Sequence, residues 1–326
     1  MKAFDSDDIK NEILSGDESR IALALRRARD LGFDADKFYA SVLDVCSFLE
    51  NKNKKLYSLP GLMAEIEANG LMLRNMNLKS IPACFAALCD LADRIDISKN
   101  DFSEFPIVLL EFKQLKKLNI SGNQLTNLPD SFINFKLLEE LDLSANFFVK
   151  MPEILSEIKS LKSLKVKCSN PLFFKGTLPN NLEELHINFT KTISYPEEIY
   201  SCATLKILEL EGISELPEAI IKFEKLEVLS IHRSGLETLP ESISTLKNLK
   251  KISLCNLLMM NKLPEVIFNL SKLEELDLSG TSLLELPAKL RLLKNLKRIN
   301  LSGCNDEKTL AHWKKRCESW GINVLT

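Results

Sequence analysis

The sequence lacks the features by which several classes of protein are identified. Its 326 residues contain no apolar run long enough to span a bilayer, and the first residues, MKAFDSDDIKNEIL, lack the apolar segment of a signal peptide. Lys and Arg number 43 against 45 Asp and Glu, a net charge of −2, so no large basic field is available to nucleic acid. We therefore expect a cytoplasmic protein with no membrane span and no nucleic-acid partner. Delivery into another cell by a specialised secretion system would leave no mark in such a sequence, so this alternative stays open.

Signatures of catalysis and of metal binding are also missing. No G-x-x-x-x-G-K-[ST] or H-E-x-x-H segment occurs, and the eight cysteines show no paired spacing such as C-x-x-C. Unpaired thiols are typical of a reducing compartment. The sequence thus predicts no metal, no cofactor and no enzyme activity.

A repeated segment dominates the chain. Residues 115–129 read LKKLNISGNQLTNLP, and residues 273–287 read LEELDLSGTSLLELP. The first residues of the inner L-x-L follow one another at spacings of 24, 23, 23, 23, 21, 23, 21, 23, 24 and 23. These positions are Leu71, Ile95, Leu118, Leu141, Leu164, Leu185, Leu208, Leu229, Ile252, Leu276 and Ile299. Such regular spacing indicates a repeat architecture rather than chance clustering of apolar residues.

Each repeat is expected to begin with a short strand, because L-x-L alternates with period 2. One strand cannot bury its own leucines, so neighbouring repeats must stack and share a continuous core. Asn100, Asn123 and Asn146 stand where the chain leaves the strand, and their amides can satisfy backbone groups inside the stack. We predict eleven parallel strands, and a twelfth at residues 322–324 with Ile322 in register with Ile299.

The frame L-x-x-L-x-L-x-x-N-x-L-x-x-L-P resembles the leucine-rich repeat, in the type that carries Leu-Pro at its middle. The resemblance implies an α/β solenoid, a horseshoe whose concave face is a parallel sheet. In that family the concave face usually binds another protein, and any catalysis belongs to an attached domain. Secreted members usually close their ends with disulfide-bonded caps, and no cysteine cluster marks either end of this chain.

The two ends depart from the repeat. Residues 1–66 are expected to form a helical cap, with a capping box at Ser15 and Glu18 and a second helix capped by Asp34. Residues 56–60 (LYSLP) are interpreted as half a repeat. Residues 67–304 would then form the solenoid. Residues 305–326 would form a C-terminal helix and strand, with Asp306 at the start of the helix.

The repeats in the middle are irregular. The repeat at Leu164 has four inserted residues within 168–176, which include Phe173 and Phe174. Its return segment, residues 179–185, is too short for a helical turn. That short form is similar to repeats of bacterial effector proteins. After Leu141 the Asn position holds other residues, so we expect weaker hydrogen bonding in those turns.

The strand residues between the leucines form columns on the exposed face. Near both ends these columns hold mostly small residues, whereas the middle gathers charged and aromatic side chains. This central patch comprises Lys165, Lys167, His186, Asn188, Phe189, Glu209, Glu211, His232 and Arg233. We predict that it binds a partner protein, with Phe189 and Arg233 as anchors. The alternative is a solvated strip whose charges only pair across strands.

Other functions remain open at this point. Glu211, His232 and Cys255 follow one another in one column, in the order acid, base and nucleophile. A strand ladder offers no oxyanion hole, however, which argues against catalysis there. His186, Glu209, Glu211 and His232 spread over three strands, which disfavours a metal site. The favoured hypothesis is a monomeric, non-enzymatic scaffold. The alternatives are an effector or enzyme acting through residues 1–66 or the Cys255 row, and a self-assembling structural protein.

Overall fold

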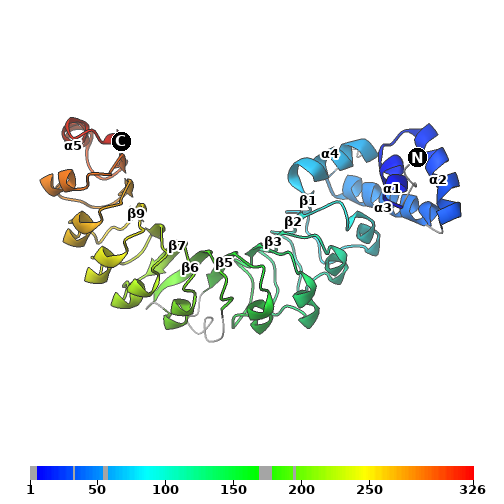
Figure 1. The fold of residues 1–326 in the computed structure, drawn as a ribbon, viewed down its shortest axis with the longest axis horizontal. Coiled ribbons are helices and arrows are strands. Elements are labelled where there is room, and N and C mark those ends of the chain that lie inside the picture. Colours follow the sequence, from blue (N-terminus) through cyan, green and yellow to red (C-terminus); the bar gives the residue numbers. More distant parts are fainter. Residues whose placement is uncertain (1–5, 32–33, 54–57, 169–177, 194–195) are drawn as a thin grey trace. The chain divides into compact units, whose positions relative to one another are not determined.

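The computed structural model describes residues 6–31, 34–53, 58–168, 178–193 and 196–326. The chain divides into two compact units, Met1–Asp142 and Leu143–Thr326, which we call the N-terminal and C-terminal units. In each unit short parallel strands lie on one side of the stacked repeats and short 3-10 helices (η) on the other (Figure 1). No helix among the described residues is long and apolar enough to cross a membrane.

The N-terminal unit begins with four α-helices and continues into the first repeats. The helices are α1 (Ser6–Leu14), α2 (Glu18–Leu31), α3 (Ala35–Asn53) and α4 (Leu59–Asn69). The strands are β1 (Leu71–Met72), β2 (Arg94–Asp96), β3 (Lys117–Asn119) and β4 (Glu140–Asp142). The 3-10 helices are η1 (Ala83–Leu88), η2 (Ile107–Glu111) and η3 (Asp130–Asn134). Neighbouring strands pair in parallel, with Leu71, Ile95, Leu118 and Leu141 in register as the spacing predicts.

The C-terminal unit holds the remaining repeats. Its strands are β5 (Ser163–Cys168), β6 (Glu184–Ile193), β7 (Ile207–Ile213), β8 (Val228–His232), β9 (Lys251–Cys255), β10 (Glu275–Asp277), β11 (Arg298–Asn300) and β12 (Asn323–Leu325). Its 3-10 helices are η4 (Glu153–Glu157), η6 (Glu197–Ser201), η7 (Glu218–Lys222), η8 (Glu241–Thr245), η9 (Glu265–Asn269) and η10 (Ala288–Leu292). Helix α5 (Glu307–Ser319) follows β11. The two units together contain the twelve parallel strands that the sequence predicts.

Alternation along each strand places the apolar side chains in the core. Leu208 and Leu210 on β7 and Leu229 and Ile231 on β8 are fully buried. A proline precedes each 3-10 helix, because its fixed φ suits the turn and it need not donate a hydrogen bond there. No helix forms between residues 178 and 183, in agreement with the short return segment; the inserted Phe173 and Phe174 lie outside the described residues.

The frame position after β2 and β3 holds a buried asparagine, Asn100 or Asn123, that bonds the turns together. Asn100 Oδ1 accepts from the N–H groups of Met76 and Leu78, at 2.9 and 3.0 Å. Its Nδ2 donates to the carbonyls of Leu73 and Ile97, at 2.7 and 2.9 Å. Later repeats replace the amide with other groups. The Ser234 hydroxyl at this position still accepts from two backbone N–H groups.

Three predictions about the ends need correction. Ser58 caps α4 by accepting from Gly61 N–H, so Leu59 and Pro60 begin a helix rather than half a repeat, and the helices extend to Asn69 rather than to residue 66. Asp17, and not Ser15, caps α2, because its Oδ1 accepts from Arg20 N–H at 2.9 Å. Val324 pairs with Ile299, so Ile322 lies two residues out of the predicted register.

Other predictions about the ends are confirmed. Asp34 Oδ1 accepts from Lys37 N–H at the start of α3, and Asp306 Oδ1 accepts from Thr309 N–H at the start of α5. The four N-terminal helices fit a cap on the first repeats. The Phe48 ring on α3 meets Phe85 of η1 edge-on, with 5.4 Å between centroids, and Lys10 Nζ lies 2.6 Å from Asp90 Oδ2.

We predict that Asn100→Ala lowers the free energy of unfolding by about 3 kcal/mol, because buried backbone groups lose their partners. Equilibrium denaturation in urea, followed by circular dichroism, measures this. Gln124→Ala is the control, because Gln124 is exposed and its change should stay within about 0.5 kcal/mol. Equal losses in the two variants would contradict the role of Asn100.

Deletion of residues 1–69 should cause aggregation or the loss of cooperative unfolding, because the apolar side chains of β1 and η1 would meet water. Size-exclusion chromatography and thermal unfolding of residues 70–326 test this. A monomer that melts at the temperature of the full chain would show that the helices are not a cap.

Candidate functional site

The longest strands of the chain lie next to one another in the C-terminal unit. Strands β5 to β9 contain between five and ten residues, whereas β10 and β11 contain three each. Lys167, Asn188, Glu211 and His232 are register partners across β5 to β8. The structure therefore brings the predicted patch residues of these strands together in adjacent rows, in the region of β5 to β9 in Figure 1.

Eight of the nine predicted residues lie at the surface. Lys165, Lys167 and Arg233 are exposed. His186, Asn188, Glu209, Glu211 and His232 are half-buried. We call these eight residues the polar strip.

Phe189 does not belong to the polar strip, and its prediction as an exposed anchor is wrong. Its side chain is only 4% exposed. Strand β6 continues to Ile193, so the alternation of Leu185, Ile187 and Phe189 on the buried side extends past the point where other repeats turn. The column position alone does not decide whether a side chain reaches the surface.

The acidic side chains of the polar strip are engaged by their neighbours. His186 Nδ1 lies 2.7 Å from Glu209 Oε2, and this hydrogen bond lowers the pKa of the Glu209 carboxyl. Asn188 Nδ2 donates to Glu211 Oε2, and Arg233 Nη1 lies 3.5 Å from Glu211 Oε1. The Glu211 carboxylate is thereby held toward the sheet, with its side chain 28% exposed.

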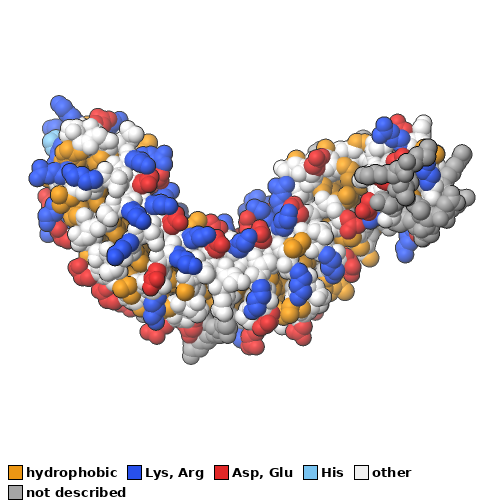
Figure 2. Space-filling view, in the orientation of Figure 1, with side chains coloured by type: hydrophobic (Ala, Val, Ile, Leu, Met, Phe, Trp, Pro, Cys, Tyr) orange, Lys and Arg blue, Asp and Glu red, His pale blue; other side chains and the backbone are white. Residues whose placement is uncertain are grey.

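The cations of the strip are much less constrained. Among the described residues Lys165 and Lys167 form no hydrogen bond and no ion pair, and the Arg233 side chain is 73% exposed. Elsewhere in this unit lysines next to the strands are paired: Lys206 with Glu183, Lys250 with Glu227 and Lys297 with Glu274, at 2.6–2.7 Å. Figure 2 shows such basic and acidic side chains side by side on the visible face. The free lysines on β5 depart from that pattern.

Arg233 also adopts an unfavourable backbone conformation. Its φ is +44°, in the left-handed region. The equivalent position holds Gly212 in the preceding repeat and Asn256, also with positive φ, in the following one. A side chain in this conformation costs about 1–2 kcal/mol, and an exposed ion pair offsets at most about 1 kcal/mol. The fold would accept glycine here, so the structure gives no stabilising reason for an arginine.

In the row of Glu211, His232 and Cys255, the acid and the thiol are hydrogen-bonded to residues outside the row. The Glu211 carboxylate bonds Asn188 and Arg233, and Cys255 Sγ lies 2.9 Å from Ser253 Oγ and 3.3 Å from Ser279 Oγ. Burial raises the pKa of the Cys255 thiol, which disfavours the reactive thiolate. Within the described part of the chain, no group of three or more His, Cys, Asp or Glu residues is placed to hold a metal ion.

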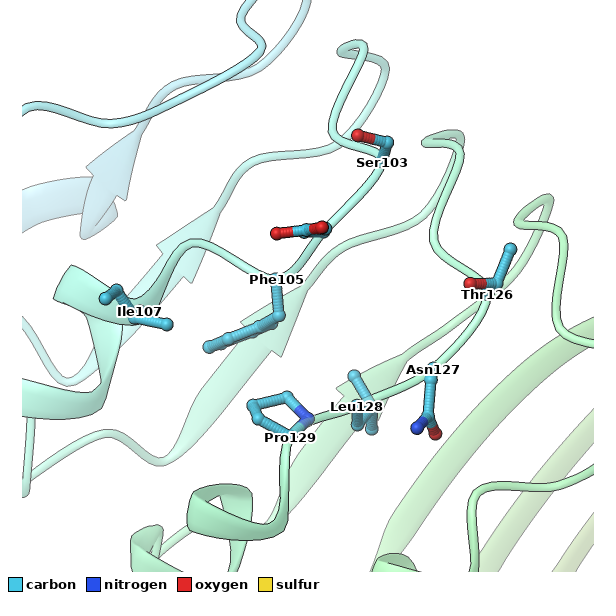
Figure 3. Close-up of a pocket in the computed structure, with 8 residues that line it drawn as sticks. Ser103, Phe105, Ile107, Thr126, Asn127, Leu128 and Pro129 are labelled. Carbon is cyan, nitrogen blue, oxygen red and sulfur yellow. The ribbon is translucent and has the colours of Figure 1, made fainter.

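Two hollows on the surface lie at equivalent positions of the repeat. One in the N-terminal unit lies between the segments that precede η2 and η3, and Figure 3 shows Phe105 and Pro129 on opposite sides of it. A second lies between the segments that precede η7 and η8, lined in part by Leu216 and Leu239. Because both are open and occupy equivalent positions, we interpret them as grooves between successive Leu-Pro turns.

An apolar surface patch lies outside the polar strip, and the strand columns of the sequence do not include it. Leu258, Met259 and Leu284 are 69%, 63% and 71% exposed. They lie in the turns after β9 and β10, where Leu284 N–H donates to Asn261 O. The run of four apolar residues at 257–260 is the sequence signal, since Leu257 and Met260 face the core and leave the middle two outside.

Comparisons with known proteins agree with this geometry. The family model described as Leucine-rich repeat region matches residues 181–318, and the model described as Leucine Rich Repeat matches residues 114–135. With its twelve parallel strands, the chain is a leucine-rich repeat solenoid. A search of curated proteins found no match to this leucine-rich repeat chain.

Among solved structures, an internalin (inlF) from Listeria monocytogenes is similar with a TM-score of 0.50 and 17% identity, covering 83% of this chain and 84% of that one. The leucine-rich repeat protein LIC12759 of Leptospira interrogans gives a TM-score of 0.39 at 19% identity, with coverages of 81% and 98%. The leucine-rich repeat domain of the type III effector XCV3220 (XopL) gives 0.46 at 18%, with coverages of 97% and 95%. At these identities the internalin shows a shared fold and nothing about function.

We predict that Arg233→Gly leaves the free energy of unfolding within about 1 kcal/mol of the parent or raises it, because relief of strain offsets the flexibility of glycine. Urea denaturation measures this, and Lys99→Gly is the matched comparison, since Lys99 is an exposed cation with φ +55° at the same position of its repeat. A loss above 2 kcal/mol would show that Arg233 stabilises the fold.

Proposed function

We propose that this leucine-rich repeat protein is a non-enzymatic scaffold that binds a partner protein through the polar strip. Leucine-rich repeat domains commonly serve as protein-interaction modules and are generally without catalytic activity. The observation that supports this site is the set of polar, exposed or half-buried side chains aligned across β5 to β8.

Two features favour this surface over the rest of the exposed sheet of the C-terminal unit. The columns beyond β8 hold mostly small side chains, such as Ser253, Ser279 and Ser302, which offer little to anchor a partner. The polar strip instead carries a guanidinium and two ammonium groups close to two imidazoles. Arginine is enriched among residues that dominate binding energy, because it forms several hydrogen bonds in one plane.

We further propose that the protein works as a monomer in the cytoplasm. The seven cysteines whose side chains the structure describes are free thiols, five of them buried. Buried thiols in a protein of an oxidising compartment would be unusual, since such chains generally use cysteine for disulfides. This supports a reducing environment, which the cytoplasm provides.

Affinity capture tests the proposal. The full chain and the variant Lys167→Ser/Arg233→Gly are immobilised and exposed to the same cell extract, and the captured proteins are compared. We expect the variant to lose the specific partner, with an affinity at least tenfold lower in a later binding assay, or about 1.4 kcal/mol.

The control variant is Leu258→Ser/Met259→Ser, which alters the exposed apolar patch and leaves the polar strip intact. Circular dichroism first establishes that each variant is folded. If the polar-strip variant binds the partner normally while the apolar-patch variant does not bind it, the recognition surface includes the apolar patch and the proposal is wrong.

A further inference from the structure

The unused hydrogen-bonding capacity of the polar strip belongs to its cationic donors and to the Nε2 atoms of His186 and His232. Both glutamates have partners within the strip, Glu209 in His186 and Glu211 in Asn188 and Arg233. The ammonium groups of Lys165 and Lys167 have none among the described residues, and Arg233 has only the contact at 3.5 Å. A ligand that satisfies the cations must therefore bring acceptors, and anionic acceptors such as carboxylates and phosphates bind ammonium and guanidinium groups most strongly.

The three cations stand at two ends of the strip. Lys165 and Lys167 lie on β5, and Arg233 directly follows β8, three strands along the same sheet. Neighbouring strands are about 4.8 Å apart, so the two ends are separated by roughly 14 Å. An extended segment advances about 3.3 Å per residue, and it covers that distance in about four residues.

The middle of the strip decides between classes of acidic ligand. Glu209 and Glu211 lie on β7, between the two cationic ends. A nucleic acid carries phosphates at regular intervals along its whole backbone, so some of them would meet these carboxylates. A peptide can place acidic side chains at the two ends only, and uncharged or basic ones between them.

We propose that the polar strip recognises an extended protein segment with two acidic side chains three to five residues apart. One carboxylate binds Lys165 and Lys167, and the other binds the Arg233 guanidinium in a bidentate manner. This inference rests on the proposed function, because it specifies the partner of the same surface. It also gives a reason for the strained, exposed arginine at a position where the preceding repeat has glycine.

The experiment uses a display library of random 12-residue peptides, selected against the full chain. Parallel selections use Arg233→Gly, Lys165→Ser/Lys167→Ser and the control Lys99→Gly. For the parent and the control we expect enrichment of peptides with Asp or Glu at two positions, three to five residues apart. The Arg233 variant should lose the preference at one position, and the double-lysine variant should lose it at the other.

The enriched peptide is then synthesised and its affinity measured by fluorescence polarisation. Replacement of either acid by Gln should weaken binding to the parent about tenfold, and the Gln peptide should show no further loss on the variant that lacks the matching cation. Binding should also weaken as NaCl rises from about 50 to about 300 mM, because exposed charges are screened.

The inference is overturned if the library gives no enrichment, if the selected peptides lack paired acids, or if both variants keep both preferences. These results differ from failure of the proposed function. A captured partner that depends on the strip but binds through a segment without acids would preserve the function and remove this inference. Loss of capture only in Leu258→Ser/Met259→Ser would remove both.

Discussion

Each strand of this chain presents leucine or isoleucine side chains that its own repeat is too small to cover, so neighbouring repeats must bury them. Leu185, Leu208, Leu229 and Ile252 follow one another across four strands with no exposure to water. The other regular features depend on that stack. The 3-10 helices return the chain for the next strand, and buried polar groups such as Asn100 satisfy the backbone inside each turn.

Core packing therefore uses only one face of the sheet and leaves the side chains of the other face variable. Side chains between the leucines point away from the core and contribute little to its packing, so their identity can change without loss of the fold. Where strands are long, more of these positions align in register, as in β5 to β8. The polar strip lies in this part of the sheet. Its charges are arranged by the repeat spacing rather than by any cavity.

Phe189 and Arg233 show how one repeat position can have two structural outcomes. Phe189 directly follows Asn188, and Arg233 directly follows His232, the register equivalent of Asn188 two strands along. At Phe189 the strand continues and the alternation turns the ring into the core. At Arg233 the backbone enters the left-handed region and the side chain reaches the solvent. The choice depends on whether the strand ends, which the repeat frame does not specify.

The sequence by itself determined the solenoid, its twelve strands, the register of its leucines, and eight of the nine residues expected at the surface of the patch. A period of about 23 residues carries this information, because each repeat must match the next to bury its leucines. The sequence did not determine that Leu59 and Pro60 begin a helix, which residue of β12 pairs with Ile299, or that Phe189 is buried. Only the tertiary structure decided these three features, because each lies in a segment where the repeat is interrupted. There the conformation depends on the residues that pack against the segment, and the repeat spacing carries no information about them.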